Sequence, residues 1–555
     1  MSLTAELLVR VLAATVFGAI ALVVLLPRLF PTATISLRLL RARHARRRHD
    51  FDMTVAARFH AALSAADGIE ALDDRTWGDL DLDEVFRSLD HTESEPGRQY
   101  LYHVLRTPNT RREPLEHLER SADLIARDDT LADRVRRALR PLADPRAAEL
   151  VHLIFAGLPR RPRIWWLFPL LTASSLTCLA LIPLWPRAFM VWLGVCVLNV
   201  CVQLYYKPRV ARFVPGLHQV PAFLRASRTL GAIGTPEFAE ETRRLREGAD
   251  RLRGLRRAAS WLMLEPGQTN DVLASVYEYV NLLFLLDVNA FVFAIDAVHR
   301  FRSVVRDVFE AMGYLDAVQS VAVWRRTLPH WTTPTSIETQ KALKVEAVIH
   351  PLLARPVANS LEVDASSVLI TGSNMSGKTT FVRTIGVNAV LAQTLHTVCA
   401  EQWRAPMLRV RTSIGRSDSL MDGKSYYLAE VESVHALIRA KETGAQHLFL
   451  LDEIFRGTNT TERVAAAYAV LAYLNRGSDI VFVATHDIEV IDLLGDDYTP
   501  YHFREEISGD AITFDYRIHP GPASTRNALA LLEAMQYPRD LVAHALATID
   551  WQVRR

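Results

Sequence analysis

The feature that most constrains this 555-residue chain is a glycine-rich segment in its C-terminal half. Residues 372–380 read Gly-Ser-Asn-Met-Ser-Gly-Lys-Thr-Thr, which matches the pattern G-x-x-x-x-G-K-[ST]. The apolar run 367–371 precedes this segment, and residues 378–396 follow it with apolar side chains at helical spacing. A strand, a glycine-rich turn and a helix in this order are the structural context of a phosphate-binding loop. The sequence therefore predicts an α/β domain that binds a nucleoside triphosphate.

Each residue type in this loop suits a triphosphate. Gly372 and Gly377 allow backbone N–H groups to close around phosphate oxygens. The side chain of Lys378, which we expect to be catalytic, is long enough to bring its ammonium group to the β- and γ-phosphates. The hydroxyl of Thr379 is suited to ligate Mg²⁺. The expected nucleotide-binding residues are Gly372, Ser373, Asn374, Met375, Ser376, Gly377, Lys378, Thr379 and Thr380.

Two further apolar runs carry polar side chains at their ends. Residues 448–451 precede Asp452 and Glu453, and residues 480–484 come shortly before His486. Ligands of parallel α/β sheets gather at the carboxyl ends of the strands. We therefore expect Asp452 in the Mg²⁺ shell, Glu453 as the group that orients or deprotonates the attacking water, and His486 at the γ-phosphate. The alternative for His486 is a histidine with a purely structural role.

With these residues assembled, the C-terminal half resembles the MutS family of ATPases, whose nucleotide-binding domain is of the ABC type. The similar segments are residues 350–351 at the domain entry, 371–380 at the loop, 452–460 at the magnesium strand, 484–486 at the switch histidine and 521–538 at the closing helices. The resemblance implies an ABC-type domain that binds ATP and Mg²⁺ and hydrolyses the ATP.

The resemblance also implies a second subunit. Residues 417–420 and 423–425 fall where the family has its signature loop. Carried over to this chain, Ser425 touches the γ-phosphate that is bound by the other subunit. A homodimer with two composite ATP sites is therefore expected.

The likeness extends more weakly upstream. Residues 72–108 resemble the start of the family's helical lever domain, and residues 207–345, which are helical in pattern, would complete it. The family's repair proteins also carry a mismatch-recognition domain with a Phe-x-Glu wedge, for which we expect no room here. The same Phe-x-Glu pattern occurs at 238–240, in a predicted helix, and at 503–505, beside the ATPase strands. Mismatch reading is therefore not expected.

Three apolar stretches indicate helices that cross a membrane. Residues 7–26, 164–185 and 188–206 are each close to the ~20 residues that a helix needs to span a bilayer core of ~30 Å. An aromatic belt frames the second and third, formed by Trp165, Trp166, Trp185, Tyr205 and Tyr206. The alternatives are buried core helices or, for the first stretch, a cleaved signal peptide.

Basic residues give the orientation. They gather between Arg38 and Arg48, at 159–163 and at 207–212, whereas the turn between the second and third stretches holds only Arg187. The positive-inside rule then predicts a multi-pass protein of the cell membrane, with its N-terminus outside and its ATPase domain in the cytoplasm. The cluster Arg38–Arg48 is expected to contact anionic lipid headgroups, with a nucleic-acid arm as the alternative.

The predicted organisation follows from these features. It comprises an N-terminal transmembrane anchor (1–30), a cytoplasmic helical region with the first part of the lever (31–163), a transmembrane helical hairpin (164–206), the second part of the all-α lever (207–345) and an α/β ABC-type P-loop ATPase domain (346–555).

Charge does not decide whether DNA is a partner. The net charge is +2, and the strongest basic stretch apart from the Arg38–Arg48 cluster, residues 243–257, has acidic neighbours that dilute it. The solvated face of a lever helix is the preferred interpretation of this stretch, and duplex binding is the alternative that the family likeness favours. Two functions stay open: a membrane-associated MutS-like ATPase that clamps DNA, and an ATP-gated scaffold that acts on a protein or lipid partner.

Overall fold

The computed structural model describes residues 52–544 except 69, 156–160, 211–212, 254–278, 339, 374–375, 416–425, 456–457, 488, 509–510, 523–536, 539 and 542–543. The predicted span 7–26 and the cluster Arg38–Arg48 lie outside the described residues. The chain divides into two compact units. The helical unit contains Met1–Ile69, Asp90–His103 and Ser121–Ala322, and the α/β unit contains Glu70–Leu89, Val104–Arg120 and Val323–Arg555.

A six-stranded sheet organises the α/β unit, with strand order β10-β9-β4-β8-β7-β6. All neighbouring strands are parallel except β9 and β10, which form an antiparallel pair. The strands are β4 (Ser367–Thr371), β6 (Arg409–Ile414), β7 (His447–Asp452), β8 (Ile480–Ala484), β9 (Tyr498–Ser508) and β10 (Ala511–Pro520). Every residue of β4, β7 and β8 is buried, as expected for central parallel strands that are covered on both faces.

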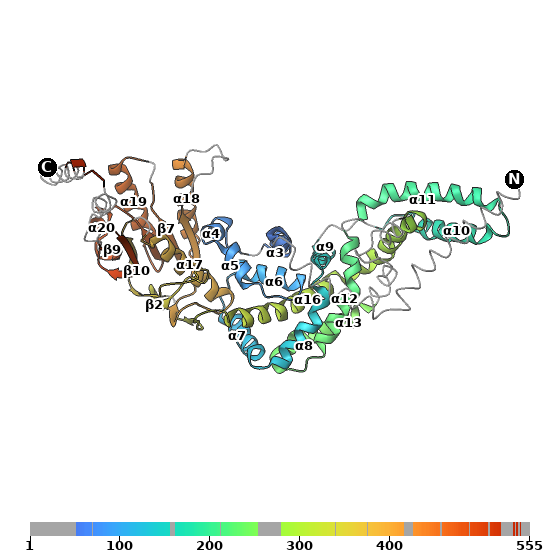
Figure 1. Ribbon diagram of the computed structural model, residues 1–555, viewed down its shortest axis with the longest axis horizontal. Helices are drawn as coiled ribbons and strands as arrows, with labels where there is room; N and C mark the ends of the chain where they lie inside the picture. The colour runs from blue at the N-terminus through green and yellow to red at the C-terminus, as the bar shows by residue number, and fades with distance from the viewer. Residues whose placement is uncertain are drawn as a thin grey trace. The chain divides into compact units, whose positions relative to one another are not determined.

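Helices cover this sheet (Figure 1). They are α17 (Lys378–Thr394), α18 (Tyr426–Lys441), α19 (Thr460–Leu474) and α20 (Glu489–Leu494). The predicted loop helix 378–396 corresponds to α17, and the predicted strands at 367–371, 448–451 and 480–484 correspond to β4, β7 and β8. A second sheet has the order β1-β5-β2-β3, with β1 (Thr335–Ser336), β2 (Ala342–Val348), β3 (Asn359–Asp364) and β5 (Gln402–Ala405).

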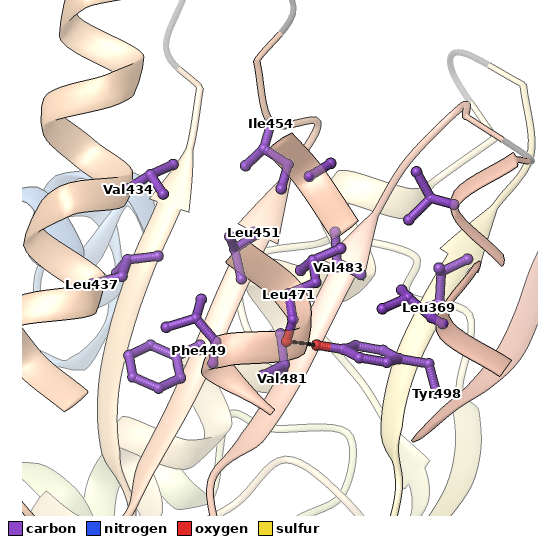
Figure 2. Close-up of a cluster of buried hydrophobic side chains, with 14 of the residues drawn as sticks. Leu369, Val434, Leu437, Phe449, Leu451, Ile454, Leu471, Val481, Val483 and Tyr498 are labelled. Carbon is purple, nitrogen blue, oxygen red and sulfur yellow. Dashed lines mark hydrogen bonds between the residues drawn. The ribbon is translucent and has the colours of Figure 1, made fainter. Parts of the chain in front are cut away.

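One hydrophobic cluster fixes helices against the main sheet (Figure 2). The strands supply Leu369, Phe449, Leu451, Val481 and Val483, and the helices supply Val434, Leu437, Leu471 and Leu474. The hydroxyl of Tyr498 donates to the carbonyl of Leu471 at 2.9 Å, so its polar group is satisfied inside the cluster. This packing holds the carboxyl ends of β4, β7 and β8 in a constant arrangement.

Part of the segment that resembles the start of the lever packs in the α/β unit. It forms α4 (Asp74–Asp79) and α5 (Leu82–Leu89). The buried carboxylate of Asp79 accepts hydrogen bonds from the Thr412 hydroxyl at 2.8 Å and from the Ile414 amide at 3.0 Å, at the end of β6. Asp81 forms an ion pair with Arg383 of α17 at 2.7 Å. These polar contacts place residues 79–81 against two elements of the nucleotide-binding unit.

The helical unit is built around one long helix, α16 (Leu286–Arg325). Around it, wholly or partly in this unit, lie among others α3 (Met53–Asp67), α6 (Glu95–Arg106), α7 (Arg112–Arg127), α8 (Asp129–Leu139), α9 (Leu150–Phe155), α12 (Val214–Gly231) and α13 (Ala239–Arg251). Asp316 of α16 is fully buried and accepts from the amides of Glu93 and Ser94, both at 2.8 Å. Asp316 thereby holds the residues just before α6, and the Ser94 hydroxyl caps this helix by accepting from the Gly97 amide at 3.0 Å. Only glycine fits at position 97, because a Cβ there would lie 2.0 Å from a carboxylate oxygen of Asp316.

The predicted membrane hairpin corresponds to α10 (Leu167–Leu181) and α11 (Ala188–Val210), which lie side by side (Figure 1). Among the described residues, Ala188–Tyr206 is the stretch long and apolar enough to cross a membrane, and α10 is a shorter apolar helix of 15 residues. Only 22% of the apolar window in α11 is buried. Its exposed side chains include Met190, Val191, Leu193, Val197, Leu198 and Leu204.

Candidate nucleotide-binding site

The glycine-rich loop joins the end of β4 to the start of α17. Gly372 and Gly377 have φ angles of 135° and 109°, in the region that favours glycine. A Cβ on Gly372 would lie 2.5 Å from the carbonyl oxygen of Phe503, so the loop closely approaches β9. The ammonium of Lys378 donates to the carbonyls of Gly372 and Ser373 at 2.7 and 2.8 Å. A positive charge is therefore held inside the curve of the loop, where a phosphate would bind.

The remaining loop residues brace this curve. Ser376 donates through its hydroxyl to the Ser373 carbonyl at 2.8 Å, and the Ser373 hydroxyl donates to Glu505 of β9. The hydroxyl of Thr384 donates to the Thr380 carbonyl at 2.7 Å one turn into α17. The predicted contacts Asn374 and Met375 lie outside the described residues.

The side chains predicted to hold Mg²⁺ come together. The hydroxyl of Thr379 donates to a carboxylate oxygen of Asp452 at 2.6 Å, although the two residues come from α17 and from the end of β7. Mg²⁺ prefers hard oxygen ligands, and its protein sites usually combine one or two carboxylates with substrate phosphates. This hydroxyl–carboxylate pair beside the Lys378 ammonium therefore fits a magnesium ion.

The two predicted catalytic groups after β7 and β8 also meet. The His486 Nε2 lies 2.9 Å from a carboxylate oxygen of Glu453 and 3.3 Å from the Lys378 ammonium. Glu453 adopts φ 48°, a left-handed conformation that is unfavourable for a residue with a side chain. Backbone strain of this kind clusters at functional sites, where the surrounding structure enforces it. The structure thus brings Lys378, Glu453 and His486 into one chain of polar contacts.

The loop after β8 is anchored on both sides. The Thr485 amide donates to the Ile370 carbonyl of β4 at 3.0 Å, and the Asp487 amide donates to the Thr485 hydroxyl at the same distance. Asp487 forms a two-pronged ion pair with Arg463 of α19 at 2.7 and 2.8 Å. These contacts limit the movement of His486 between its two anchored neighbours.

One side chain at the loop was not found by sequence reasoning. The ring of Tyr516 lies 3.4 Å from the position that a Cβ on Gly377 would take, and the tyrosine is 47% exposed. The amide side chain of Asn359 holds this strand, because it donates to the Tyr516 carbonyl at 3.0 Å and accepts from the Ile518 amide at 2.8 Å. No spacing rule relates Tyr516 to the loop, since the antiparallel β9–β10 hairpin alone brings it there. An aromatic ring therefore stands at the loop.

Two expected parts of the site lie outside the described residues. Ser425 belongs to residues 416–425, which connect β6 to α18, and residues 523–536 include most of the expected closing helices. Ile414, the last residue of β6, is the register partner of Asp452 on β7. The segment that carries Ser425 thus follows a strand that ends beside the predicted magnesium ligand.

A mainly parallel sheet, a lysine-bearing glycine loop after β4 and a carboxylate pair at the end of β7, the next strand but one, define a P-loop nucleotide-binding domain. Residues 368–551 match the family model described as MutS domain V. The C-terminal part of the chain is therefore similar to MutS domain V, which confirms for this region the resemblance seen in the sequence.

Curated relatives give the same result. The chain is 36% identical over 219 residues to the DNA mismatch repair protein MutS of Thermus aquaticus, which covers 38% of this chain and 26% of that protein. It is 34% identical over 217 residues to the protein of the same name from Thermus thermophilus, with the same shares. The likeness to the Natronomonas pharaonis protein of this name is 31% over 211 residues, or 36% and 24% of the two chains. The chain thus spans about a quarter of the length of the curated relatives it matches.

Proposed function

We propose that this protein is a membrane-anchored, MutS-like ATPase that binds ATP with Mg²⁺ and hydrolyses it as a homodimer. The observation that carries the proposal is the convergence of three elements on one loop. Lys378 lies inside the loop, the Thr379–Asp452 pair lies beside it, and His486 joins Glu453 to the lysine. MutS domain V over residues 368–551 supports the ATP-binding part of the proposal.

The arrangement supports a hydrolysis in which water attacks the γ-phosphorus. Glu453 orients this water and accepts its proton as the new oxygen–phosphorus bond forms and the bond to the β,γ-bridging oxygen breaks. Lys378 stabilises the negative charge that moves onto the departing ADP. His486, held between these two groups, contacts the γ-phosphate. Mg²⁺ held by Thr379 and Asp452 would neutralise phosphate charge.

The aromatic ring beside the loop gives the nucleotide a further contact. Tyr516 is 47% exposed and its ring lies beside Gly377, and an aromatic ring in this position could stack on a nucleotide base. We assign this role to Tyr516.

The homodimer rests on the family likeness. Ser425 is assigned to the γ-phosphate held by the partner subunit, which would complete each site in trans. A composite site of this kind makes hydrolysis depend on association, because neither subunit alone would hold the full set of phosphate contacts.

The exposed apolar surface of the hairpin supports membrane insertion. A soluble protein rarely leaves a helix such as α11 so apolar and so little buried. Near the start of α10 the guanidinium of Arg161 lies 3.5 Å from the Trp165 ring centroid, and near the end of α11 that of Arg209 lies 3.9 Å from the Tyr205 ring centroid. Basic and aromatic side chains at the same end of a hairpin are typical of a membrane interface, here assigned to the cytoplasmic side.

Coupling of the ATPase to DNA is proposed because the relatives that this chain matches are DNA mismatch repair proteins. The basic stretch that begins at Arg243 weakens this proposal, because Arg243 and Arg244 pair with Glu240 at 2.8 Å, and Arg253 pairs with Asp250 at 2.7 Å. Intrahelical pairs of this kind are typical of a solvated helix face. The second candidate function is therefore an ATP-gated membrane scaffold that acts without DNA.

Steady-state hydrolysis tests the nucleotide part. The detergent-solubilised full chain should hydrolyse ATP in a Mg²⁺-dependent reaction whose specific activity rises with protein concentration. Lys378→Ala should abolish this hydrolysis. Tyr516→Ala should raise the KM for ATP about tenfold with little change in kcat, since stacking contributes about 1–3 kcal/mol per base. Tyr516→Phe is the matched control and should behave as wild type. Equal activity of wild type and Lys378→Ala would refute the proposal.

A salt series separates the two candidate functions. If DNA is the partner, the protein should bind homoduplex, mismatched or branched DNA at low salt in an ATP-dependent manner, and the affinity should fall as salt rises. No measurable binding even at low salt would rule out the DNA clamp in favour of the scaffold, because phosphate contacts are strongest there.

A further inference from the structure

The segment that leads into α16 is apolar and packs against the hairpin. Residues 279–295 contain a single charged side chain, that of Asp287, and Glu278 stands just before them. Val280 and Phe284 of this segment join Leu179 and Ile182 in one buried cluster, close to the turn between α10 and α11. The apolar surface of the hairpin is thus partly covered by a third stretch of chain.

The other end of this segment reaches the opposite end of α10. The ring of Phe293 meets that of Trp165 with centroids 6.4 Å apart, and Asp296 forms an ion pair with Arg161 at 2.8 Å. The segment therefore runs antiparallel to α10, from the turn of the hairpin to its aromatic and basic end. About 14 residues at ~1.5 Å per residue cover roughly 20 Å, which is most of a ~30 Å bilayer core.

The segment is interrupted in the middle of this path. A helical turn ends at Phe284, Leu285 has a left-handed φ of 51°, and α16 begins at Leu286. A break between helices leaves backbone carbonyls without an intrahelical partner. In water the solvent would satisfy these groups, but inside a bilayer each unsatisfied group costs several kcal/mol.

Polar side chains from the neighbouring helices satisfy these carbonyls. The Asn199 amide of α11 donates to the Leu283 carbonyl at 2.5 Å, and the Thr172 hydroxyl of α10 donates to the Phe284 carbonyl at 2.8 Å. The Leu285 carbonyl accepts from the Asn289 backbone amide at 2.9 Å and also from the Asn289 side-chain amide at 3.0 Å, and this side-chain amide donates to the Thr172 hydroxyl at 2.8 Å. Each helix around the break thus contributes a hydrogen-bond donor to it.

The start of α16 is closed in the same way. Asn281 is fully buried, accepts from the Asp287 amide at 3.0 Å and donates to the Asp287 carboxylate at 2.7 Å. Asn199 is also fully buried. These side chains face the break inside an otherwise apolar bundle. Irregular backbone at membrane depth is tolerated where protein encloses it in this manner.

From this arrangement we propose that residues 279–292 form a third membrane-embedded segment, packed on the α10–α11 hairpin and sealed at its break by Thr172, Asn199, Asn281 and Asn289. The proposal rests on membrane insertion of the hairpin. It changes the expected topology, because the chain after residue 207 then returns to the membrane before it continues along α16 to the α/β unit.

Fluorescence quenching by lipids tests this topology in the full chain. Cys178, Cys196, Cys201 and Cys399 are first replaced by alanine, and a single cysteine is introduced for an environment-sensitive dye. The labelled protein is reconstituted in vesicles whose lipids carry a nitroxide either near the headgroup or deep in the acyl chain. Retained ATP turnover shows that each variant is folded.

The expected result is a depth order. Dyes at Leu198 of α11 and at Leu282 should each lose about half of their fluorescence to the deep nitroxide, whereas a dye at Phe293 should respond more strongly to the shallow one. A dye at the exposed Asp307 of α16 is the control and should respond to neither. Leu286 is the second position if labelling at Leu282 abolishes turnover.

The outcomes separate the two proposals. Quenching at Leu198 without quenching at Leu282 and Leu286 would overturn the third segment and leave the membrane anchor intact. Absence of quenching at Leu198, Leu282 and Leu286 would overturn both the third segment and the membrane insertion of the hairpin. Deep quenching at Leu198 and Leu282 together with shallow quenching at Phe293 would establish the segment.

Discussion

Replacement of Glu453 by glutamine should lower ATP turnover by a factor of about 10² to 10⁴, the usual contribution of a general base. The amide keeps the size of the side chain and one oxygen that can accept from His486, but it cannot take a proton from water. Affinity for ATP should stay within a few-fold of wild type, because the loop, Lys378 and the Thr379–Asp452 pair are unchanged. Single-turnover ADP formation and equilibrium nucleotide binding measure the two effects separately.

Glu442→Gln is the matched control, because it removes an exposed carboxylate of the same unit just after α18, away from the loop. Turnover of this variant should equal that of wild type. If Glu453→Gln retained turnover within threefold of wild type, Glu453 would not be the base, and the contact between Glu453 and His486 would need another role.

Loss of the Asp79 carboxylate should loosen the end of β6. One carboxylate oxygen accepts from both the Thr412 hydroxyl and the Ile414 amide, and Asp79 is only 5% exposed. Asp79→Ala leaves two buried donors without this acceptor, at a cost of about 1–3 kcal/mol for each. Hydrogen exchange of a peptide that covers residues 409–415 should then be at least tenfold faster than in wild type.

Asp79→Asn separates the loss of hydrogen bonds from the loss of charge. The asparagine keeps one side-chain oxygen that can accept from both donors, so exchange at 409–415 should stay close to wild type. A peptide from α19, which belongs to neither α4 nor β6, serves as the internal reference in both variants. Unchanged exchange in Asp79→Ala would show that other contacts hold this strand end. Because Ile414 is the register partner of Asp452, we also expect lower kcat in the alanine variant.

The central strands and the loop helix were predictable from the sequence alone. Uninterrupted apolar runs mark β4, β7 and β8 because both faces of these strands are covered, and the polar residues that follow them lie at one edge of the sheet because the strands are parallel. The meeting of Thr379 with Asp452 and of Glu453 with His486 follows from the same rule. These positions needed no knowledge of long-range packing.

Other features required the tertiary structure. Tyr516 lies at the loop through the antiparallel β9–β10 hairpin, whose register shift between Phe514 and Ile518 no local pattern indicates. The segment that carries Asp79 resembles the start of the lever, yet it packs in the α/β unit because its buried carboxylate finds its donors on β6. Polar side chains interrupt the apolar sequence of residues 279–292, so hydropathy alone does not place this segment beside the hairpin. The tertiary structure does, because it shows these polar side chains hydrogen-bonded to the backbone at the break between the helices.

The phosphate-binding loop at 372–380 illustrates the difference between what the sequence determines and what the tertiary structure decides. By itself the sequence determined the class of site, since glycine conformational freedom, a long cation and a hydroxyl at fixed spacing are local properties of the chain. The tertiary structure decided the individual contacts, namely Thr379 with Asp452 and His486 with both Glu453 and Lys378, and it alone brought Tyr516 to the loop. Contacts between residues far apart in sequence depend on sheet order and on side-chain packing, and neither is encoded in any one segment.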